Sequence, residues 1–149
     1  MDLSKYYKQA IITPSVIVFT LMIIYSIIDR INNGEYKSEW LDNNSLYIVL
    51  FIMILANTLI FTILFLPLFL NKIKNINESR ILNFLSWFLA PSIWVAYILT
   101  KHIRLILYTK QFQWEETIFI SIMIIPFMIA IIVSFIKFKK EQKRNILLN

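Results

Sequence analysis

The sequence contains no cysteine, a single histidine (His102) and a single glycine (Gly34). Without cysteine the chain cannot form a disulfide or carry out redox chemistry through a thiol. One histidine cannot supply both axial ligands of a bis-histidine haem, and a membrane metalloprotease needs several histidine or carboxylate ligands at bilayer depth. The lone glycine also excludes a Gly-xxx-Gly helix-packing motif. We therefore expect no metal site and no cofactor.

Charged residues are scarce as well, at 16% of the 149 residues, whereas 58% of the residues are hydrophobic. A soluble domain typically has about 25% charged and 45–50% apolar residues. Four segments free of charge account for the difference: 11–28, 46–70, 81–100 and 117–136. Each has at least the roughly 18 residues that a helix needs to cross a ~30 Å hydrocarbon core. The sequence predicts one domain, 1–149, that is all-α and polytopic, with four transmembrane helices in an antiparallel bundle.

The lysines and arginines near the span ends predict the orientation of the chain. Ten of the fifteen cations lie in the N-terminal tail, the link 71–80 and the C-terminal tail 137–149, and five lie in the other two connections. Both termini are therefore expected to be cytoplasmic. No small-residue cleavage site follows the first segment, so we expect a retained helix rather than a signal peptide. The excess of Ile, Lys and Asn is typical of AT-rich coding, which favours a bacterial inner membrane.

Residues 101–110 are amphipathic and follow the third span on its outer side. Lys101, Arg104 and Tyr108 share one helical face, while aliphatic residues occupy the other. Two structures fit this pattern. One is a short helix in the outer headgroup region, and the other is a third span prolonged to about Leu107 with its cations reaching back to the interface.

No span contains an ionisable residue, and such residues are the usual markers of transport or proton relay in membranes. A proton-coupled exporter needs a membrane carboxylate, and an intramembrane serine protease needs a base at bilayer depth. Glu115 and Glu116 stand in the expected first turn of the fourth helix, where carboxylates interact favourably with the helix dipole. An enzyme acting at the interface stays as a third class of function, with His102, Arg104, Glu115 and Glu116 as its candidate site.

The polar residues inside the spans are uncharged. Asn57 is near the centre of the second span, next to Thr58 and one turn before Thr62. An amide in hydrocarbon needs a partner, and such contacts contribute about 0.6–2 kcal/mol. Asn57 therefore forms either a hydrogen bond between helices of one chain or a contact across the axis of an oligomer.

The third span carries a stripe of small residues, Ser92, Ala96 and Thr100, at intervals of four positions. Such a stripe permits close approach of another helix, from the same chain or from a partner. Pro91 and Pro126 are interior to the third and fourth spans and are expected to bend them. These bends are either fixed or part of a hinge.

Two hypotheses of function follow. The first is a non-catalytic integral membrane protein, an accessory, regulatory or toxin-immunity subunit, that acts through helix packing and the acidic outer loop 29–42. The second is a homo-oligomeric ion channel or membrane-permeabilising effector, with Asn57, Thr58 and Thr62 along its constriction. The expected contact residues of the outer face are Glu35, Tyr36, Glu39, Trp40, Asp42, His102 and Arg104.

The C-terminal tail carries five cations between Lys137 and Arg144. Clusters of this kind attract anionic lipids by about 1 kcal/mol for each nearby cation. No folded module accompanies the tail, so we expect it to contact lipid and anchor the topology rather than bind nucleic acid. The expected partners are thus the bilayer, its anionic lipids, and either a second membrane protein or further copies of this chain.

Overall fold

The computed structural model describes the backbone of residues 2–34 and 43–147 and the side chains of residues 2–32 and 47–144. Within these ranges the helical elements are α1 (Leu3–Asn33), α2 (Asn43–Leu64), the 3₁₀ helix η1 (Leu66–Lys72), α3 (Lys74–Glu78), α4 (Arg80–Thr109) and α5 (Trp114–Leu147). The described chain contains no strand. Four helical stretches are long and apolar enough to cross a membrane: Leu3–Asn32, Tyr47–Lys72, Arg80–Thr109 and Trp114–Arg144. The prediction of an all-helical chain with four such stretches is confirmed.

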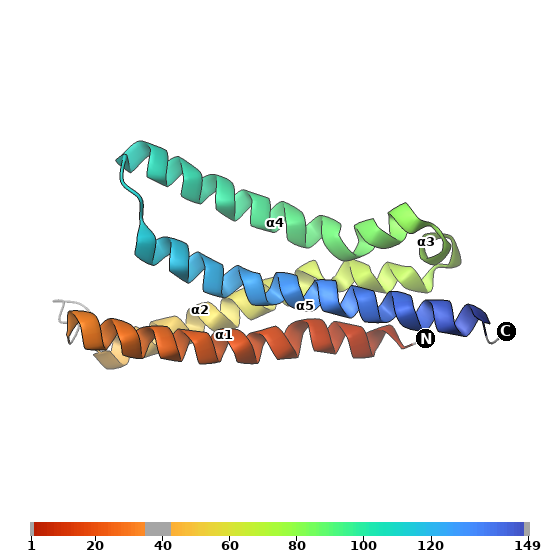
Figure 1. The fold of residues 1–149 in the computed structure, drawn as a ribbon, viewed down its shortest axis with the longest axis horizontal. Coiled ribbons are helices and arrows are strands. Elements are labelled where there is room, and N and C mark those ends of the chain that lie inside the picture. Colours follow the sequence, from red (N-terminus) through yellow and green to blue (C-terminus); the bar gives the residue numbers. More distant parts are fainter. Residues whose placement is uncertain (1, 35–42, 148–149) are drawn as a thin grey trace.

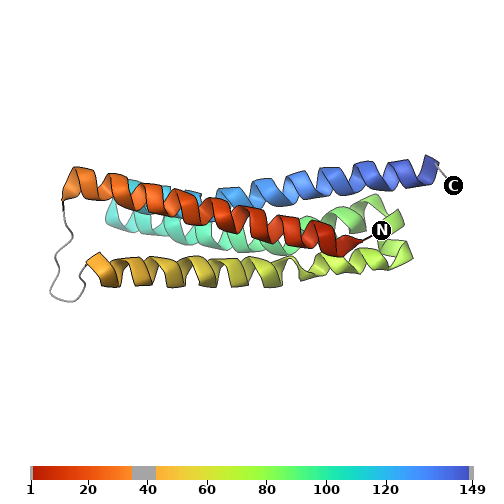
Figure 2. The same ribbon diagram turned by 90° about the horizontal axis from the view of Figure 1, so that it is seen from below.

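Helices α1 and α5 form the most extensive helix pair in the molecule. Figure 1 shows that the N and C termini lie at the same end and that the connection between α4 and α5 lies at the opposite end. Figure 2 shows α2 beside α1, with η1 continuing α2 toward the end that carries the termini. The start of α4 packs on η1 and α3, and α4 then diverges from α5 (Figure 1).

Short-range capping sets the ends of the helices. The Asp2 carboxylate accepts a hydrogen bond from the Ser4 backbone nitrogen at 2.9 Å, which caps the start of α1. Gly34 follows the end of α1 with φ at 77°, a conformation that favours glycine, and its N–H donates to the Arg30 carbonyl. Ser79 caps the start of α4 through its hydroxyl, as Asp2 does for α1.

The second span changes from α-helix to 3₁₀ helix just before Pro67. The α-helix ends at Leu64, and Pro67 lies in the first turn of η1. Because proline has no backbone N–H, the α-helical hydrogen bonds cannot run through it unchanged, and short 3₁₀ turns are common at such points. The charge-free segment predicted at 46–70 is therefore an α-helix followed by a tighter turn.

The third span continues as one helix into the stretch 101–110 and ends at Thr109. Of the two structures considered for this stretch, the prolonged helix is the one observed. Lys110 ends it with φ at 54°, in the left-handed conformation. The cations of this stretch therefore extend from the last turns of a long helix rather than from a separate one.

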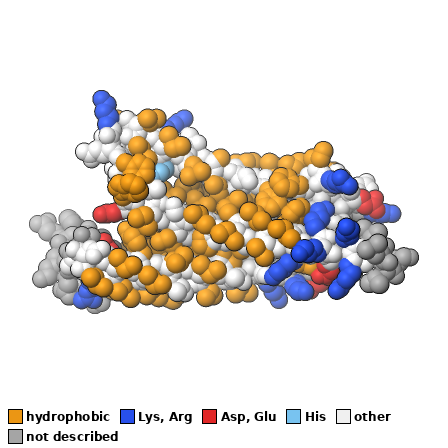
Figure 3. Space-filling model, in the orientation of Figure 1, with side chains coloured by type: hydrophobic (Ala, Val, Ile, Leu, Met, Phe, Trp, Pro, Cys, Tyr) orange, Lys and Arg blue, Asp and Glu red, His pale blue; other side chains and the backbone are white. Residues whose placement is uncertain are grey.

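The core lies where α1, α5 and α4 meet η1, nearer to the end with the termini. Its largest buried side chains are mostly aromatic: Tyr6, Phe61, Phe65, Trp87, Phe127 and Phe138. Phe61 of α2 stacks on Phe127 of α5 with ring centroids 4.3 Å apart, a contact worth about 0.5–1.5 kcal/mol beyond the area it buries. Outside the core, hydrophobic side chains cover the middle of the molecule, and lysines and arginines gather at the end with the termini (Figure 3).

Candidate functional site

The uncharged polar residues of the second span contact neighbouring helices of the same chain. The Asn57 amide nitrogen donates to the Met123 carbonyl of α5 at 3.0 Å. The Thr58 hydroxyl donates to the Ser15 hydroxyl of α1 at 3.3 Å, and the Thr62 hydroxyl donates to the Thr58 carbonyl at 2.7 Å. All three side chains of α2 are half-buried. Each therefore has a partner inside the chain, and their use in a pore stays a prediction.

The partner of Asn57 lies in the turn of α5 that precedes Pro126. Proline cannot donate to the carbonyl four residues before it, which here is that of Ile122. Carbonyls freed in a membrane helix must face protein or water, and the amide reaches the adjacent carbonyl, that of Met123. Pro91 and Pro126 are both buried inside helices that continue past them. A hinge at either proline stays a prediction.

A hollow of about 230 Å³ opens beside Asn57, between α2, α4 and α5. Asn57 is the only polar side chain in its wall, which is otherwise made of residues such as Ile60, Ile98 and Phe119. A hollow this apolar provides no continuous polar path through the chain.

The small-residue stripe of α4 faces outward. Ser92, Ala96 and Thr100 are all exposed. The Thr100 hydroxyl donates to the Ala96 carbonyl of its own helix at 2.7 Å. Large exposed side chains flank the stripe, with Ile93 62% and Tyr97 53% exposed. The stripe thus lies beside bulky residues on a helix face that the described chain leaves uncovered.

His102 joins the C-terminal end of α4 to the start of α5. Its side chain is 8% exposed, and Nε2 lies 2.8 Å from the Thr117 hydroxyl. That hydroxyl already donates its single proton to the Gln113 carbonyl at 2.7 Å, so the imidazole donates from Nε2. Nδ1 then faces the Glu116 carboxylate at 3.6 Å and forms no hydrogen bond.

Of the residues considered for an interfacial enzyme, the structure brings together His102 and Glu116. No hydrogen bond or ion pair within the described chain connects Arg104 or Glu115 to them, and both are exposed. No group of three His, Cys, Asp or Glu that could hold a metal ion occurs among the described residues. The other outer contact candidates lie outside the described residues: Glu35, Tyr36, Glu39, Trp40 and Asp42.

A polar cluster that the sequence did not single out lies where η1 and α3 meet α4 and α5. The Asn71 amide donates to the Ser86 hydroxyl at 2.6 Å, and that hydroxyl donates to the Asn83 carbonyl at 2.7 Å. The Gln142 amide of α5 donates to the Asn77 side-chain oxygen at 3.0 Å. The only sequence signal for this cluster is the repeated occurrence of short polar residues near the span ends. These bonds fix the link 71–80 onto α4 and α5.

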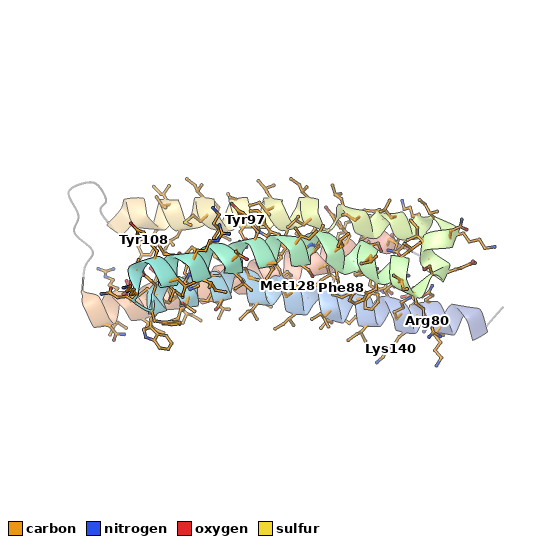
Figure 4. All side chains as sticks on the ribbon, turned by 90° about the horizontal axis from the view of Figure 1, so that it is seen from above. Arg80, Phe88, Tyr97, Tyr108, Met128 and Lys140 are labelled. Atoms are coloured by element: carbon orange, nitrogen blue, oxygen red, sulfur yellow. The ribbon has the colours of Figure 1, made fainter. Side chains whose placement is uncertain are left out.

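A basic pocket of about 450 Å³ lies between the first turns of α1 and the last turns of α5. Its wall contains four cations: Lys5, Lys137, Lys140 and Arg144. Glu141 is the one acid in the wall, and its carboxylate accepts a hydrogen bond from the Tyr6 hydroxyl. Figure 4 shows Lys140 extending away from α5 at the end of the molecule where Arg80 begins α4. The tail cations were expected to contact lipid, but their pairing with the start of α1 was not foreseen.

These contacts describe an all-helical chain with four apolar stretches long enough to cross a membrane, a polar contact between α2 and α5, a face of α4 that the described chain leaves uncovered, and a basic end. Comparison with family models, with curated proteins and with solved structures finds no match to this chain.

Proposed function

We propose that this chain is a non-catalytic integral membrane protein that acts by packing against a second membrane protein, as an accessory, regulatory or toxin-immunity subunit. In this proposal the four spans form an antiparallel bundle in a bacterial inner membrane, with both termini in the cytoplasm. The orientation is supported by the ten cations in the tails and in the link 71–80.

The observation that carries the proposal is the outward-facing stripe of α4. The small side chains of Ser92, Ala96 and Thr100 are exposed, although small residues in membrane helices are enriched where another helix approaches closely. The polar residue at mid-depth, Asn57, is already bonded within the chain. An oligomer axis would need a free polar side chain there, whereas a packing partner needs only the uncovered face of α4.

The acidic outer loop is the second contact surface of the proposal. Asp29 begins it at the end of α1, and its remaining contact candidates are those of the segment 35–42. Neutralising Glu35, Glu39 and Asp42 together should weaken the complex if the partner binds through the negative charge of this loop. An unchanged complex would place the whole contact within the spans.

Gentle extraction from the native membrane, followed by mass measurement of the intact complex, tests the proposal. We expect a mass that is not a multiple of the 17.8 kDa chain, because a different protein is bound. Thr100→Leu should dissociate this complex, since the added bulk prevents the close approach of another helix to the small-residue stripe.

Thr20→Leu is the matched control for this substitution. Thr20 is also exposed, and its hydroxyl also donates to the carbonyl four residues earlier, that of Val16, at 2.9 Å. The two variants therefore make the same chemical change on α1 and on α4. If the two variants retain the same amount of complex, the assignment of α4 as the packing face is wrong.

The homo-oligomeric channel is the alternative function, and the hollow beside Asn57 is the observation that favours it. Several copies would then surround an axis, with a weakly polar constriction that gates by dewetting. A complex mass that is a multiple of 17.8 kDa, together with currents that Asn57→Leu abolishes, would favour this alternative.

A further inference from the structure

The basic pocket at the end of α1 and α5 has an excess of positive charge that the described chain does not neutralise. None of its four cations forms an ion pair with a described acid. The single carboxylate of the wall, that of Glu141, is bonded to the Tyr6 hydroxyl. The pocket is therefore suited to an anion, and its volume of about 450 Å³ is larger than a monatomic ion requires.

An apolar groove of about 320 Å³ adjoins this pocket and follows the same two helices toward the middle of the molecule. Gln9 lines both, so that the two lie next to each other at this residue. Along α1 the groove extends from Gln9 to Leu21, which is about 18 Å at 1.5 Å per residue. One leaflet of a ~30 Å hydrocarbon core is about 15 Å thick. The groove therefore has the length of one leaflet.

The wall changes in polarity along the groove in the same order as a phospholipid does. Apart from Tyr6, the lining residues on α1 recur every four positions: Lys5, Gln9, Thr13, Ile17 and Leu21. This face passes from a cation to an amide, then a hydroxyl, then alkyl groups. The Gln9 amide and the Thr13 hydroxyl form no hydrogen bond with any other described residue, so both are available to the ester oxygens of a glycerol backbone.

The facing wall on α5 shows the same order. Lining residues of α5 recur at intervals of three and four positions, which keeps them on one helical face: Pro126, Ala130, Val133, Lys137, Lys140 and Arg144, with Ile125 and Ile129 beside them in the groove and Glu141 in the pocket. The cations of this face lie in the pocket, and the apolar residues lie in the groove. Both helices thus place charge at the chain ends and apolar surface at membrane depth.

From these two matched walls we propose that α1 and α5 bind one anionic phospholipid of the leaflet nearest the chain termini. Its phosphate lies among Lys5, Lys137, Lys140 and Arg144, its ester oxygens near Gln9 and Thr13, and one acyl chain in the groove. A free phosphate ion would use the pocket but would have no need of the apolar groove. The lipid site does not depend on the packing face of α4, because it lies on other helices.

Native mass spectrometry of the delipidated full-length chain tests this site by titration. The probes are phosphatidylglycerol, phosphatidylcholine with the same acyl chains, and glycerol 3-phosphate, which carries the phosphate without acyl chains. We expect one phosphatidylglycerol to bind with at least tenfold preference over phosphatidylcholine. Glycerol 3-phosphate should neither bind at these concentrations nor displace the lipid.

The pocket is tested by replacing Lys137, Lys140 and Arg144 together with Gln. At about fivefold for each cation, affinity for phosphatidylglycerol should fall roughly 100-fold. The control replaces with Gln three exposed cations that lie at the same end but outside the pocket wall: Lys8, Lys72 and Lys143. Equal losses in the two triple variants would overturn the pocket, since they would reflect net charge alone. All substituted side chains extend from the surface of the molecule, and circular dichroism checks that the helices persist.

The groove is tested by Ala130→Phe, which places a ring where the acyl chain lies. We expect affinity for phosphatidylglycerol to fall about tenfold, because the ring overpacks the space that the acyl chain fills. Ala90→Phe makes the same change at another half-buried alanine, on α4 and outside both the pocket and the groove, and should leave affinity unchanged. If Ala130→Phe has no effect and glycerol 3-phosphate binds as tightly as the lipid, the site is a phosphate site and the proposal is wrong. Equal binding of phosphatidylcholine would overturn it as well.

Discussion

The hydrogen bond from Asn57 to the Met123 carbonyl makes a quantitative prediction about stability. Asn57→Leu removes the donor and leaves a side chain of similar size, so little cavity forms. The carbonyl at the other end of the bond belongs to the backbone of α5, which continues as an α-helix through the following residues. The carbonyl therefore keeps a helical partner when the amide is removed.

The expected loss in the free energy of unfolding is the contribution of a single interhelical hydrogen bond. Such bonds average about 0.6 kcal/mol in a membrane protein and reach about 1.7 kcal/mol. The distance of 3.0 Å is that of a well-formed bond. Asn57→Leu should accordingly lower the free energy of unfolding by about 0.6–1.7 kcal/mol, a factor of roughly three to twenty in the equilibrium constant.

Titration of the purified monomer from mild detergent into sodium dodecyl sulfate, followed by circular dichroism, measures this change. Thr62→Val is the control, because the Thr62 hydroxyl donates only within its own helix and its loss removes no contact between helices. Asn57→Leu should destabilise the monomer more than Thr62→Val does. If both variants unfold at the same fraction of sodium dodecyl sulfate as the unaltered chain, the bond to Met123 does not hold α2 to α5. If Asn57→Leu instead abolishes an oligomer and leaves the stability of the monomer unchanged, Asn57 lies at an axis between chains.

Substitutions at three further positions test the core and the two ends. Phe127→Ala empties a site with 0% exposure and should lower the free energy of unfolding by about 3–5 kcal/mol; thermal unfolding in detergent measures this, and a loss below about 1 kcal/mol would contradict its place in the core. His102→Ala removes the bond to Thr117 and should cost about 1 kcal/mol by the same assay. His102→Gln, which retains a donor, should recover part of this loss. Tyr6→Phe removes the hydroxyl that donates to the Glu141 carboxylate and should cost about 1 kcal/mol or more. Limited proteolysis should then cut the C-terminal turns of α5 sooner, and unchanged cleavage would contradict that role.

The number and approximate position of the spans could be predicted from the sequence because charge is absent from them. A charged residue in hydrocarbon is costly, so the runs without charge mark the helices directly. The end of the α-helical part of the second span was harder to predict. Pro67 can be read from the sequence, but the change to a 3₁₀ helix at Leu66 depends on how the chain turns onto α4.

The pairing of helices could not be predicted, because buried and exposed faces have the same composition. Ala10 is 0% exposed and Ile12 is 59% exposed, and both are apolar residues of one helix. In water such a helix would show a polar face, and periodicity would reveal the buried side. In a membrane the lipid-facing side is as apolar as the core. The close pairing of α1 with α5, on which the basic pocket depends, therefore leaves little trace in the sequence.

The same reasoning explains why uncharged polar side chains are the informative residues of this chain. A methylene group is nearly indifferent between lipid and protein, whereas an amide or hydroxyl at membrane depth must find a partner. Asn57 finds one on α5 and Thr58 finds one on α1, so these side chains fix α2 against both helices. Gln9 and Thr13 have none among the described residues, and they lie on the wall that joins the basic pocket to the apolar groove. The unpartnered amide of Gln9 and hydroxyl of Thr13 are thus found where a lipid would supply the acceptors.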